Sequence, residues 1–134
     1  MSGNLTIGLI RASLPSYFPE KYDVWSRAQS ALSALCEEES VTLFMAPDIP
    51  MDARDTQKAL DHCAAAGADF ILLLHGGFSM GDVARTIAAA PVKAGFWSVP
   101  EPVRTGDIQL NNFVSLNMSM SIARQVRDLN QHPV

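Results

Sequence analysis

The segment with the clearest chemical potential runs from His75 to Ser79 and reads His-Gly-Gly-Phe-Ser. It follows an apolar run, residues 70–74, and precedes a helical pattern, so it predicts a turn from a strand into a helix N-terminus. Free N–H groups at such a turn favour an anion or a sugar hydroxyl, and Gly76 and Gly77 would let a ligand approach the backbone closely. A tight turn that needs glycine for its dihedral angles and binds nothing fits these residues equally well.

His75 has a side chain that titrates near neutrality and ring nitrogens that suit a proton shuttle or a metal ligand. The sequence offers it no spaced partner, because HxH, HExxH and CxxC patterns are absent. A hydrogen-bonded structural histidine is the favoured interpretation. Cys36 and Cys63 lie on apolar faces of predicted helices and are interpreted as core residues, not as nucleophiles or a disulfide. We therefore predict no catalytic residue and no metal ligand in this chain.

Arg11 is the charged candidate after the first apolar run, since its planar guanidinium can bind a carboxylate or phosphate through two hydrogen bonds. A surface charge is the commoner role for such a residue. The loop that it opens contains neither GxGxxG nor GxxxxGK[ST], which weakens the case for a nucleotide cofactor. A phosphoacceptor receiver domain would need acidic residues at the places of Arg11 and His75, so that class is excluded.

These residues must be positioned by the elements around them. Apolar runs alternate with helical patterns, which is typical of an α/β protein. Short crossovers require parallel strands with right-handed connections. We predict one domain over residues 1–134, a doubly wound, flavodoxin-like parallel sheet of strand order 2-1-3-4 with helices on both faces. The strands are expected at residues 5–10, 41–46, 70–74 and 93–99, and Pro133-Val134 matches the start of an incomplete fifth strand.

The strand ends and helix starts set where chemistry is expected. Ligands of open parallel sheets bind outside the carboxyl ends of the strands, so the segments after the third and fourth strands should meet at one rim. Ser79 and Asp82 form a capping-box-like pair at the start of the third helix. The last helix is expected from about Leu116, after a long connection at residues 103–114, with Met118, Ile122, Val126 and Leu129 on one side.

Composition excludes several function classes. Ten Lys and Arg stand against 14 Asp and Glu, and no cationic cluster is present, so nucleic acid is not an expected partner. The longest aliphatic and aromatic run, residues 70–74, is far shorter than the roughly 20 residues that cross a bilayer. The chain opens without a basic and apolar leader. We expect a cytoplasmic protein with no membrane partner.

The second half of the chain carries a family resemblance. Residues 96–102 read Phe-Trp-Ser-Val-Pro-Glu-Pro, and Leu-Asn-Asn-Phe and Leu-Asn-Met follow at 110–113 and 116–118. With Leu-Leu-His-Gly-Gly-Phe-Ser-Met-Gly at 73–81, this resembles the N-terminal domain of the L-fucose isomerase and L-arabinose isomerase group, in particular its fucose-isomerase-like members. The resemblance covers residues 70–130.

The resemblance implies part of an aldose–ketose isomerase that uses Mn²⁺ or a similar ion. The metal ligands of such enzymes belong to later domains, so this chain is expected to bind no cofactor and to be inactive alone. It implies as partners a sugar substrate, the missing downstream catalytic domains and further copies in a homo-oligomer. The loops at the strand ends would wall the substrate site, with Arg11, His75, Gly76, Gly77 and Glu101 as candidate substrate-binding residues. Glu101 also has a plainer interpretation, as a cap of a backbone N–H or the partner of a lysine.

Two alternatives from other classes stay open. One is a free-standing sugar-binding sensor module of the same flavodoxin-like fold, and the other is a flavodoxin-like redox protein. Four aromatic residues before and within the first helix either form a contact patch or, as the commoner outcome, pack on their own domain; they are Tyr17, Phe18, Tyr22 and Trp25.

Overall fold

The computed structural model describes residues 4–131 of the 134-residue chain, and strands and helices alternate along them. The strands are β1 (Thr6–Ala12), β2 (Thr42–Met45), β3 (Phe70–His75) and β4 (Lys93–Ser98). The helices are the short 3-10 helix η1 (Pro19–Tyr22), then α1 (Val24–Glu38), α2 (Ala53–Ala65), α3 (Gly81–Ala89) and α4 (Asn112–Gln131).

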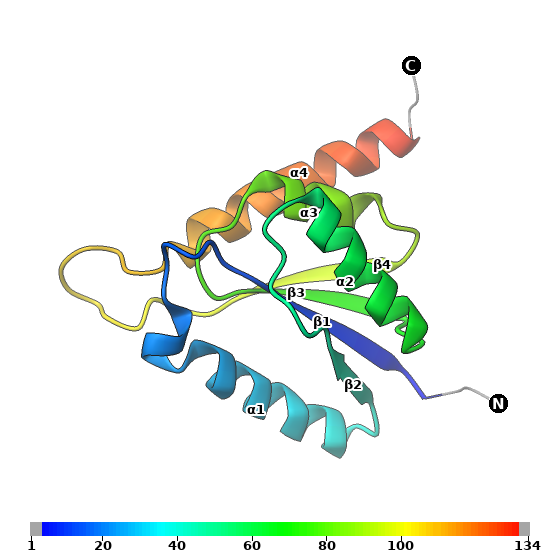
Figure 1. Cartoon of the computed structure of the whole chain (residues 1–134), viewed down its shortest axis with the longest axis horizontal. Coiled ribbons are helices and arrows are strands. Elements are labelled where there is room, and N and C mark those ends of the chain that lie inside the picture. Colours follow the sequence, from blue (N-terminus) through cyan, green and yellow to red (C-terminus); the bar gives the residue numbers. More distant parts are fainter. Residues whose placement is uncertain (1–3, 132–134) are drawn as a thin grey trace.

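All four strands are parallel and lie in the order β2-β1-β3-β4, which confirms the predicted doubly wound, flavodoxin-like α/β fold (Figure 1). In the central pair, Arg11 lies opposite Leu74 and Ala12 opposite His75. The carboxyl ends of β1 and β3 are therefore level with each other. The predicted start of a fifth strand, Pro133-Val134, lies outside the described residues.

The two faces of the sheet are covered unequally. α1 lies on one face, and α2, α3 and α4 lie on the other (Figure 1). Because successive side chains of a strand point to opposite faces, Leu9 and Leu74 pack toward α1, whereas Ile10 and Leu73 pack toward α2 and α3. Burial of these two apolar layers is the main favourable term in folding. The arrangement leaves the β4 end of the α1 face with the least cover.

The two cysteines are buried and free, as the sequence predicted. Cys36 packs on the α1 side of the sheet and Cys63 on the opposite side, so the sheet itself separates them. Burial raises the pKa of the Cys63 thiol to about 11, which keeps it protonated and unreactive near neutrality. A Cβ on Gly8 would lie 2.7 Å from the Cys63 sulfur, which shows how tightly α2 packs on β1.

The helix starts differ in how they are capped. α2 begins as expected from its sequence, because the Asp52 carboxylate accepts a hydrogen bond from the Asp55 N–H at 2.8 Å. The predicted hydroxyl cap of α3 is wrong, because Met80 is the N-cap residue and makes no side-chain cap, whereas Asp82 lies in the first turn of the helix as expected. Ser79 stands one residue too early, where its N–H donates to the Ser115 hydroxyl of α4 at 3.1 Å.

A helix needs about 20 predominantly apolar residues to cross a bilayer. α4 has 20 residues, but it carries Arg124, Arg127 and Asp128. Within residues 4–131, no helix combines the necessary length with the necessary apolar character.

Candidate functional site

The loops after β1, β3 and β4 are joined by backbone hydrogen bonds at one end of the sheet. The Leu14 N–H donates to the Phe78 carbonyl at 2.7 Å, and the Phe78 N–H donates to the Leu110 carbonyl at 2.8 Å. The Leu110 N–H in turn donates to the Glu101 carboxylate at 2.9 Å. The segments that carry His75 and Glu101 therefore lie at a common rim, as the predicted order of parallel strands implied.

The candidate side chains at this rim nevertheless point to opposite faces of the sheet. Arg11 lies in register with Leu74, which packs toward α1. His75 lies in register with Ala12, which packs toward α2 and α3. The carboxyl ends of β1 and β3 therefore lie side by side, but the Arg11 guanidinium and the His75 imidazole lie on opposite faces of the sheet.

Arg11 ties three elements to one another. Its Nη2 donates to the Pro47 carbonyl after β2 at 2.8 Å, and its guanidinium carbon lies 5.8 Å from the centroid of the Trp25 ring in α1. Stacking of this kind contributes about 0.5–2 kcal/mol. The guanidinium thus holds the loop after β2 through Nη2 and stacks on Trp25, while its buried Nε has no hydrogen-bond partner among the described residues.

His75 is fully buried between β4 and α4. Its Nδ1 lies 3.4 Å from the Trp97 carbonyl and its Nε2 lies 2.9 Å from the Ser119 hydroxyl. A carbonyl only accepts, so the neutral ring carries its proton on Nδ1 and accepts at Nε2 from Ser119. Desolvation by burial lowers the pKa of His75 from 6.5, and hydrogen bonds to the Trp97 and Leu73 backbone oppose that shift in part. His75 is therefore a neutral structural histidine, in line with the favoured interpretation of its sequence.

The lowered pKa of His75 makes stability depend on pH. Between the folded pKa and the unfolded value of 6.5, the unfolded chain binds more protons, so the free energy of unfolding rises with pH. His75 thus contributes stability that is fully present above pH 6.5 and is lost as the pH falls below it. We expect the melting temperature to decrease from pH 7 to pH 5.5, with a slope from this group of at most about 1.4 kcal/mol per pH unit.

The matched variants are His75→Gln, which removes the titrating ring, and His62→Gln, which removes an exposed histidine of α2. The slope between pH 7 and 5.5 should disappear in the first and persist in the second. An NMR titration of the wild-type imidazole supplies an independent check that needs no variant. An unchanged slope in His75→Gln, or a His75 pKa at or above 6.5, contradicts the assignment.

Gly76 and Gly77 are required by packing. A Cβ on Gly76 would overlap the ring of Trp25, and one on Gly77 would overlap the Ser13 hydroxyl and lie 2.9 Å from the Tyr17 Cβ. Within the described residues, the glycines with positive φ are Gly67 and Gly106, so the expectation that this turn needs glycine for its dihedral angles is wrong. The glycines let α1 and the β1 loop approach the β3 turn, and both are buried.

Glu101 acts as the cap of α4. Its carboxylate accepts hydrogen bonds from the N–H groups of Leu110, Asn111 and Asn112, at 2.9, 2.6 and 3.3 Å. The negative charge also lies at the positive end of the helix dipole. Because of this cap, α4 begins at Asn112 and not near Leu116 as the sequence suggested. The contacts of Glu101 thus match its interpretation as a cap of backbone N–H groups.

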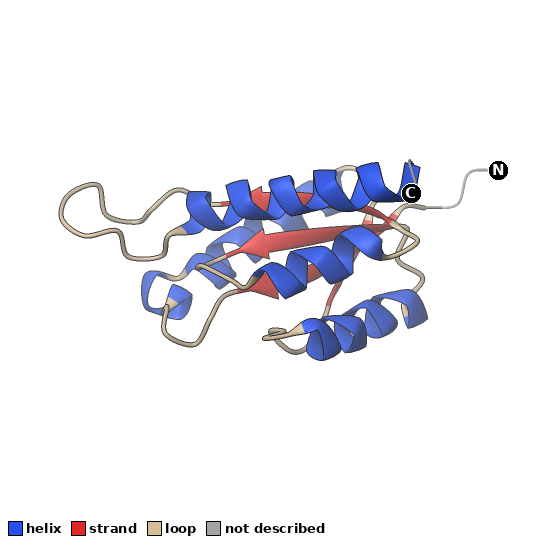
Figure 2. Cartoon of the chain, turned by 90° about the horizontal axis from the view of Figure 1, so that it is seen from above, coloured by secondary structure: helices blue, strands red, loops and turns tan. Residues whose placement is uncertain are grey.

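The cap also closes the loop formed by residues 102–109, which we call the arm. Figure 2 shows the arm projecting past the end of the sheet, beyond the start of α4. Val103 and Ile108 on the arm are exposed, and Gln109 at its end accepts a hydrogen bond from the Tyr22 hydroxyl at 2.8 Å. The base of the arm is thus fixed on two sides, and the arm presents two apolar side chains to solvent near its ends.

The aromatic residues before and within α1 pack largely on their own domain. Tyr17 lies against Phe78, with ring centroids 6.3 Å apart, and Trp25 is half-buried beneath Arg11. Phe18 is the exception, with 56% of its surface exposed. The expectation that these aromatic residues pack on their own domain therefore holds for most of them.

Sequence reasoning missed a buried polar seam along α4. Asn112, Ser115 and Ser119 recur at helical spacing and all are fully buried, whereas Phe113, Val114 and Met120 are exposed. The seam hydrogen-bonds to the Val99 carbonyl, the Ser79 N–H and His75. The spacing of 112, 115 and 119 was the available signal, but serine and asparagine at a buried face are uncommon. Of the predicted inner side, Val126 is buried and Met118 and Ile122 are half-buried, while the Leu129 side chain lies outside the described part.

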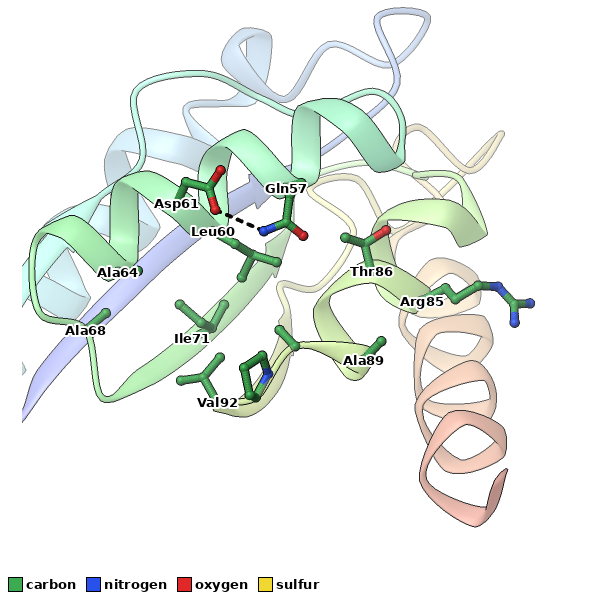
Figure 3. Close-up of a pocket in the computed structure, with 12 residues that line it drawn as sticks. Gln57, Leu60, Asp61, Ala64, Ala68, Ile71, Arg85, Thr86, Ala89 and Val92 are labelled. Atoms are coloured by element: carbon green, nitrogen blue, oxygen red, sulfur yellow. Dashed lines mark hydrogen bonds between the residues drawn. The ribbon is translucent and has the colours of Figure 1, made fainter. Parts of the chain in front are cut away.

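A cavity of about 690 Å³ lies away from the rim, between α2, α3 and the start of β4. Leu60, Ile71 and Val92 line it, and the Gln57 amide donates to the Asp61 carboxylate at 3.0 Å beside it (Figure 3). The Arg85 guanidinium points away from the cavity in the same view (Figure 3). The cavity is an apolar groove whose nearby polar groups are paired with each other, and it offers no reactive constellation.

Within residues 4–131, no group of three or more His, Cys, Asp or Glu side chains is arranged to hold a metal ion. The chain matches no protein-family model, and neither the curated proteins nor the solved structures give a significant match to it.

Proposed function

We propose that this chain is the N-terminal substrate-wall and oligomerisation domain of a metal-dependent aldose–ketose isomerase that resembles the L-fucose and L-arabinose isomerases. In this proposal the chain supplies no reacting group. The divalent ion and its ligands belong to downstream catalytic domains, and this domain presents its strand-end rim and its arm to a neighbouring domain or subunit.

One observation carries the proposal: Glu101 fixes the arm on the N-terminus of α4 through three N–H groups. The residues that give the family resemblance, Val-Pro-Glu-Pro and Leu-Asn-Asn, are those that build this closure. A loop held so firmly at its base, with exposed Val103 and Ile108 near its ends, is suited to contact another domain. The resemblance supplies the substrate class, a sugar, and the reaction class.

The candidate substrate-binding residues take different parts in this proposal. Gly76, Gly77 and the buried His75 support the rim from within, since packing already occupies the space around them. Arg11 holds the β1 loop and keeps Nε as a donor. Contact with the sugar is therefore assigned to the arm and to backbone groups of the rim, with Glu101 as the residue that positions the arm.

The coding sequence downstream of Val134 tests the proposal directly. The reading frame should continue into domains that carry glutamate, aspartate and histidine ligands for a divalent ion. The chain alone, assayed with Mn²⁺ and L-fucose or L-arabinose, should form no ketose. A stop codon directly after Val134 overturns the proposal.

The arm gives a quantitative prediction for the longer polypeptide. Replacement of residues 103–108 by Gly-Gly should raise KM for the sugar roughly tenfold, a loss of about 1.4 kcal/mol, because one wall of the site is removed. The metal ligands are untouched, so kcat per assembled site should change less. Ketose formation and gel filtration measure both effects. Unchanged KM together with an unchanged oligomeric state contradicts the role of the arm.

A second candidate, the free-standing sugar-binding module, is favoured by two buried polar atoms without hydrogen-bond partners. Ser79 Oγ and Asn112 Oδ1 are buried and have no hydrogen-bond partner in the described part of the chain. Such a group costs about 1–3 kcal/mol when it stays unpaired, and a ligand hydroxyl that enters the seam would satisfy it. These atoms belong to the buried seam between α4 and the β3 turn.

The module hypothesis predicts thermal stabilisation of the isolated chain by its sugar. At a ligand concentration 100 times Kd, the free energy of unfolding should rise by about 2.7 kcal/mol, which raises the melting temperature by roughly 10 °C. A panel of pentoses, deoxyhexoses and sugar phosphates provides the ligands. No shift with any member removes this candidate.

A further inference from the structure

A second cavity, of about 430 Å³, lies between α1 and the base of the arm. We call it the α1-side pocket. Its walls include Trp97 and Val99 at the end of β4, Pro100 and Glu101 at the base of the arm, and two arginines, Arg27 on α1 and Arg104 on the arm. Its volume falls within the range of about 300–1,000 Å³ that is usual for small-molecule sites.

The pocket exists because α1 is the one described α-helix on this face of the sheet. β4 is the edge strand, so no further strand beyond it supports a neighbouring helix within residues 4–131. Trp97 consequently packs against the core beneath α1 on one side and stays half-buried. An indole in this position offers an apolar surface to a bound ring.

The charges at the pocket do not cancel one another. Arg27 and Arg104 are exposed, and in the described part of the chain neither guanidinium has an ion-pair or hydrogen-bond partner. Glu101 also lines the pocket, so two guanidinium groups face one carboxylate there, and both oxygens of that carboxylate accept hydrogen bonds from the backbone at the start of α4. Two cationic groups from separate elements therefore flank an aromatic wall in a protein whose net charge is −4.

We infer that the α1-side pocket binds a small organic anion in which a carboxylate or phosphate is joined to a ring. The guanidinium groups of Arg27 and Arg104 hold the oxyanion, because their planar donor sets match carboxylate and phosphate. The ring lies against Trp97 and Pro100. The inference concerns the isolated chain and does not depend on the isomerase proposal.

NMR of the indole N–H signals tests the pocket, because the chain has two tryptophans and only Trp97 lines it. Phenyl phosphate and benzoate separate the two oxyanions. Inorganic phosphate lacks the ring, and benzyl alcohol lacks the charge. At least one ring-bearing anion should shift the Trp97 signal saturably and more than the Trp25 signal, with an affinity that falls as salt is added. Benzyl alcohol should cause no saturable shift.

Arg27→Ala and Arg104→Ala should each weaken this binding roughly tenfold, and the double variant should abolish it. Arg85→Ala is the matched control, because that arginine is exposed on α3, outside the pocket. Both arginines of the pocket are exposed, so their removal should leave the melting temperature nearly unchanged. The inference is overturned if no ring-bearing anion binds, if inorganic phosphate binds as tightly as phenyl phosphate, or if Arg85→Ala weakens binding as much as Arg27→Ala.

Discussion

Replacing Glu101 by alanine should lower the free energy of unfolding by about 2–3 kcal/mol and the melting temperature by roughly 10 °C. The carboxylate accepts part-buried hydrogen bonds from the N–H groups of Leu110, Asn111 and Asn112, and an alanine side chain has no acceptor to replace it. Alanine removes three charge-assisted hydrogen bonds and the favourable interaction with the helix dipole. Asn111 adds a further constraint, because its φ of 60° lies in the left-handed region and is held there by these contacts.

Asp107→Ala is the matched control, since it removes an exposed carboxylate from the same arm without touching the cap. It should change the melting temperature by no more than a degree or two. Glu101→Gln keeps one carbonyl acceptor and should fall between alanine and the wild type. Amide hydrogen exchange at Leu110 and Asn112 should accelerate in that variant even if its global stability is nearly retained. A Glu101→Ala protein that melts like Asp107→Ala contradicts the cap.

The fold could be predicted from sequence because its signals are local. Each apolar run, such as Phe70 to Leu74, predicts a buried strand by itself. Short connections between parallel strands then allow only a few strand orders for the sheet. The start of α4 could not be predicted in this way. Its cap, Glu101, lies outside the helix and reaches Asn112 across 11 residues, so the first turn looks like part of a loop. The exposed Phe113 and Val114 strengthen that impression.

The rim of the site could be predicted, but not what its side chains do there. Strand order places the residues after β1, β3 and β4 together. Whether a side chain faces α1 or α4 depends on register and on which helix covers which face, and these are tertiary properties. Arg11 and His75 were candidates for one wall, yet Arg11 packs under the α1 side and His75 under α4. Similarly, nothing local in His-Gly-Gly reveals that Trp25 occupies the space beside Gly76.

Replacing Gly76 by alanine should destabilise the protein by about 3 kcal/mol, one of the largest effects expected of a single methyl group. The new Cβ would overlap the Trp25 ring, which is held in place by Arg11 and by the core beneath α1. Neither partner can yield easily, because the ring is rigid and the β3 turn is tied to β1 through the hydrogen bond from the Gly76 N–H to the Ala12 carbonyl at 3.0 Å. We expect a melting temperature lower by roughly 10–15 °C.

Gly67→Ala provides the contrast, because Gly67 has a φ of 77° and open space around its missing Cβ. That variant suffers backbone strain alone and should lose only about 1 kcal/mol. If crowding is the cause at Gly76, a smaller residue at position 25 should relieve it. In a double-mutant cycle, Trp25→Leu should therefore cost less in the Gly76→Ala background than in the wild type, with a coupling energy of about 1–2 kcal/mol.

The cycle also decides between the two interpretations of the His-Gly-Gly turn. A glycine kept for close approach of a ligand would tolerate alanine in the free protein, and its loss would appear only in binding. A glycine kept for packing loses stability with no ligand present and regains part of it when Trp25 is trimmed. If the effects of the two substitutions are additive, or if the Gly76→Ala protein is as stable as the wild type, packing does not explain the glycine. The turn is then again a candidate ligand-binding site. Because a Cβ on Gly76 would overlap the Trp25 ring, we expect the effects of the two substitutions on the free energy of unfolding to be coupled.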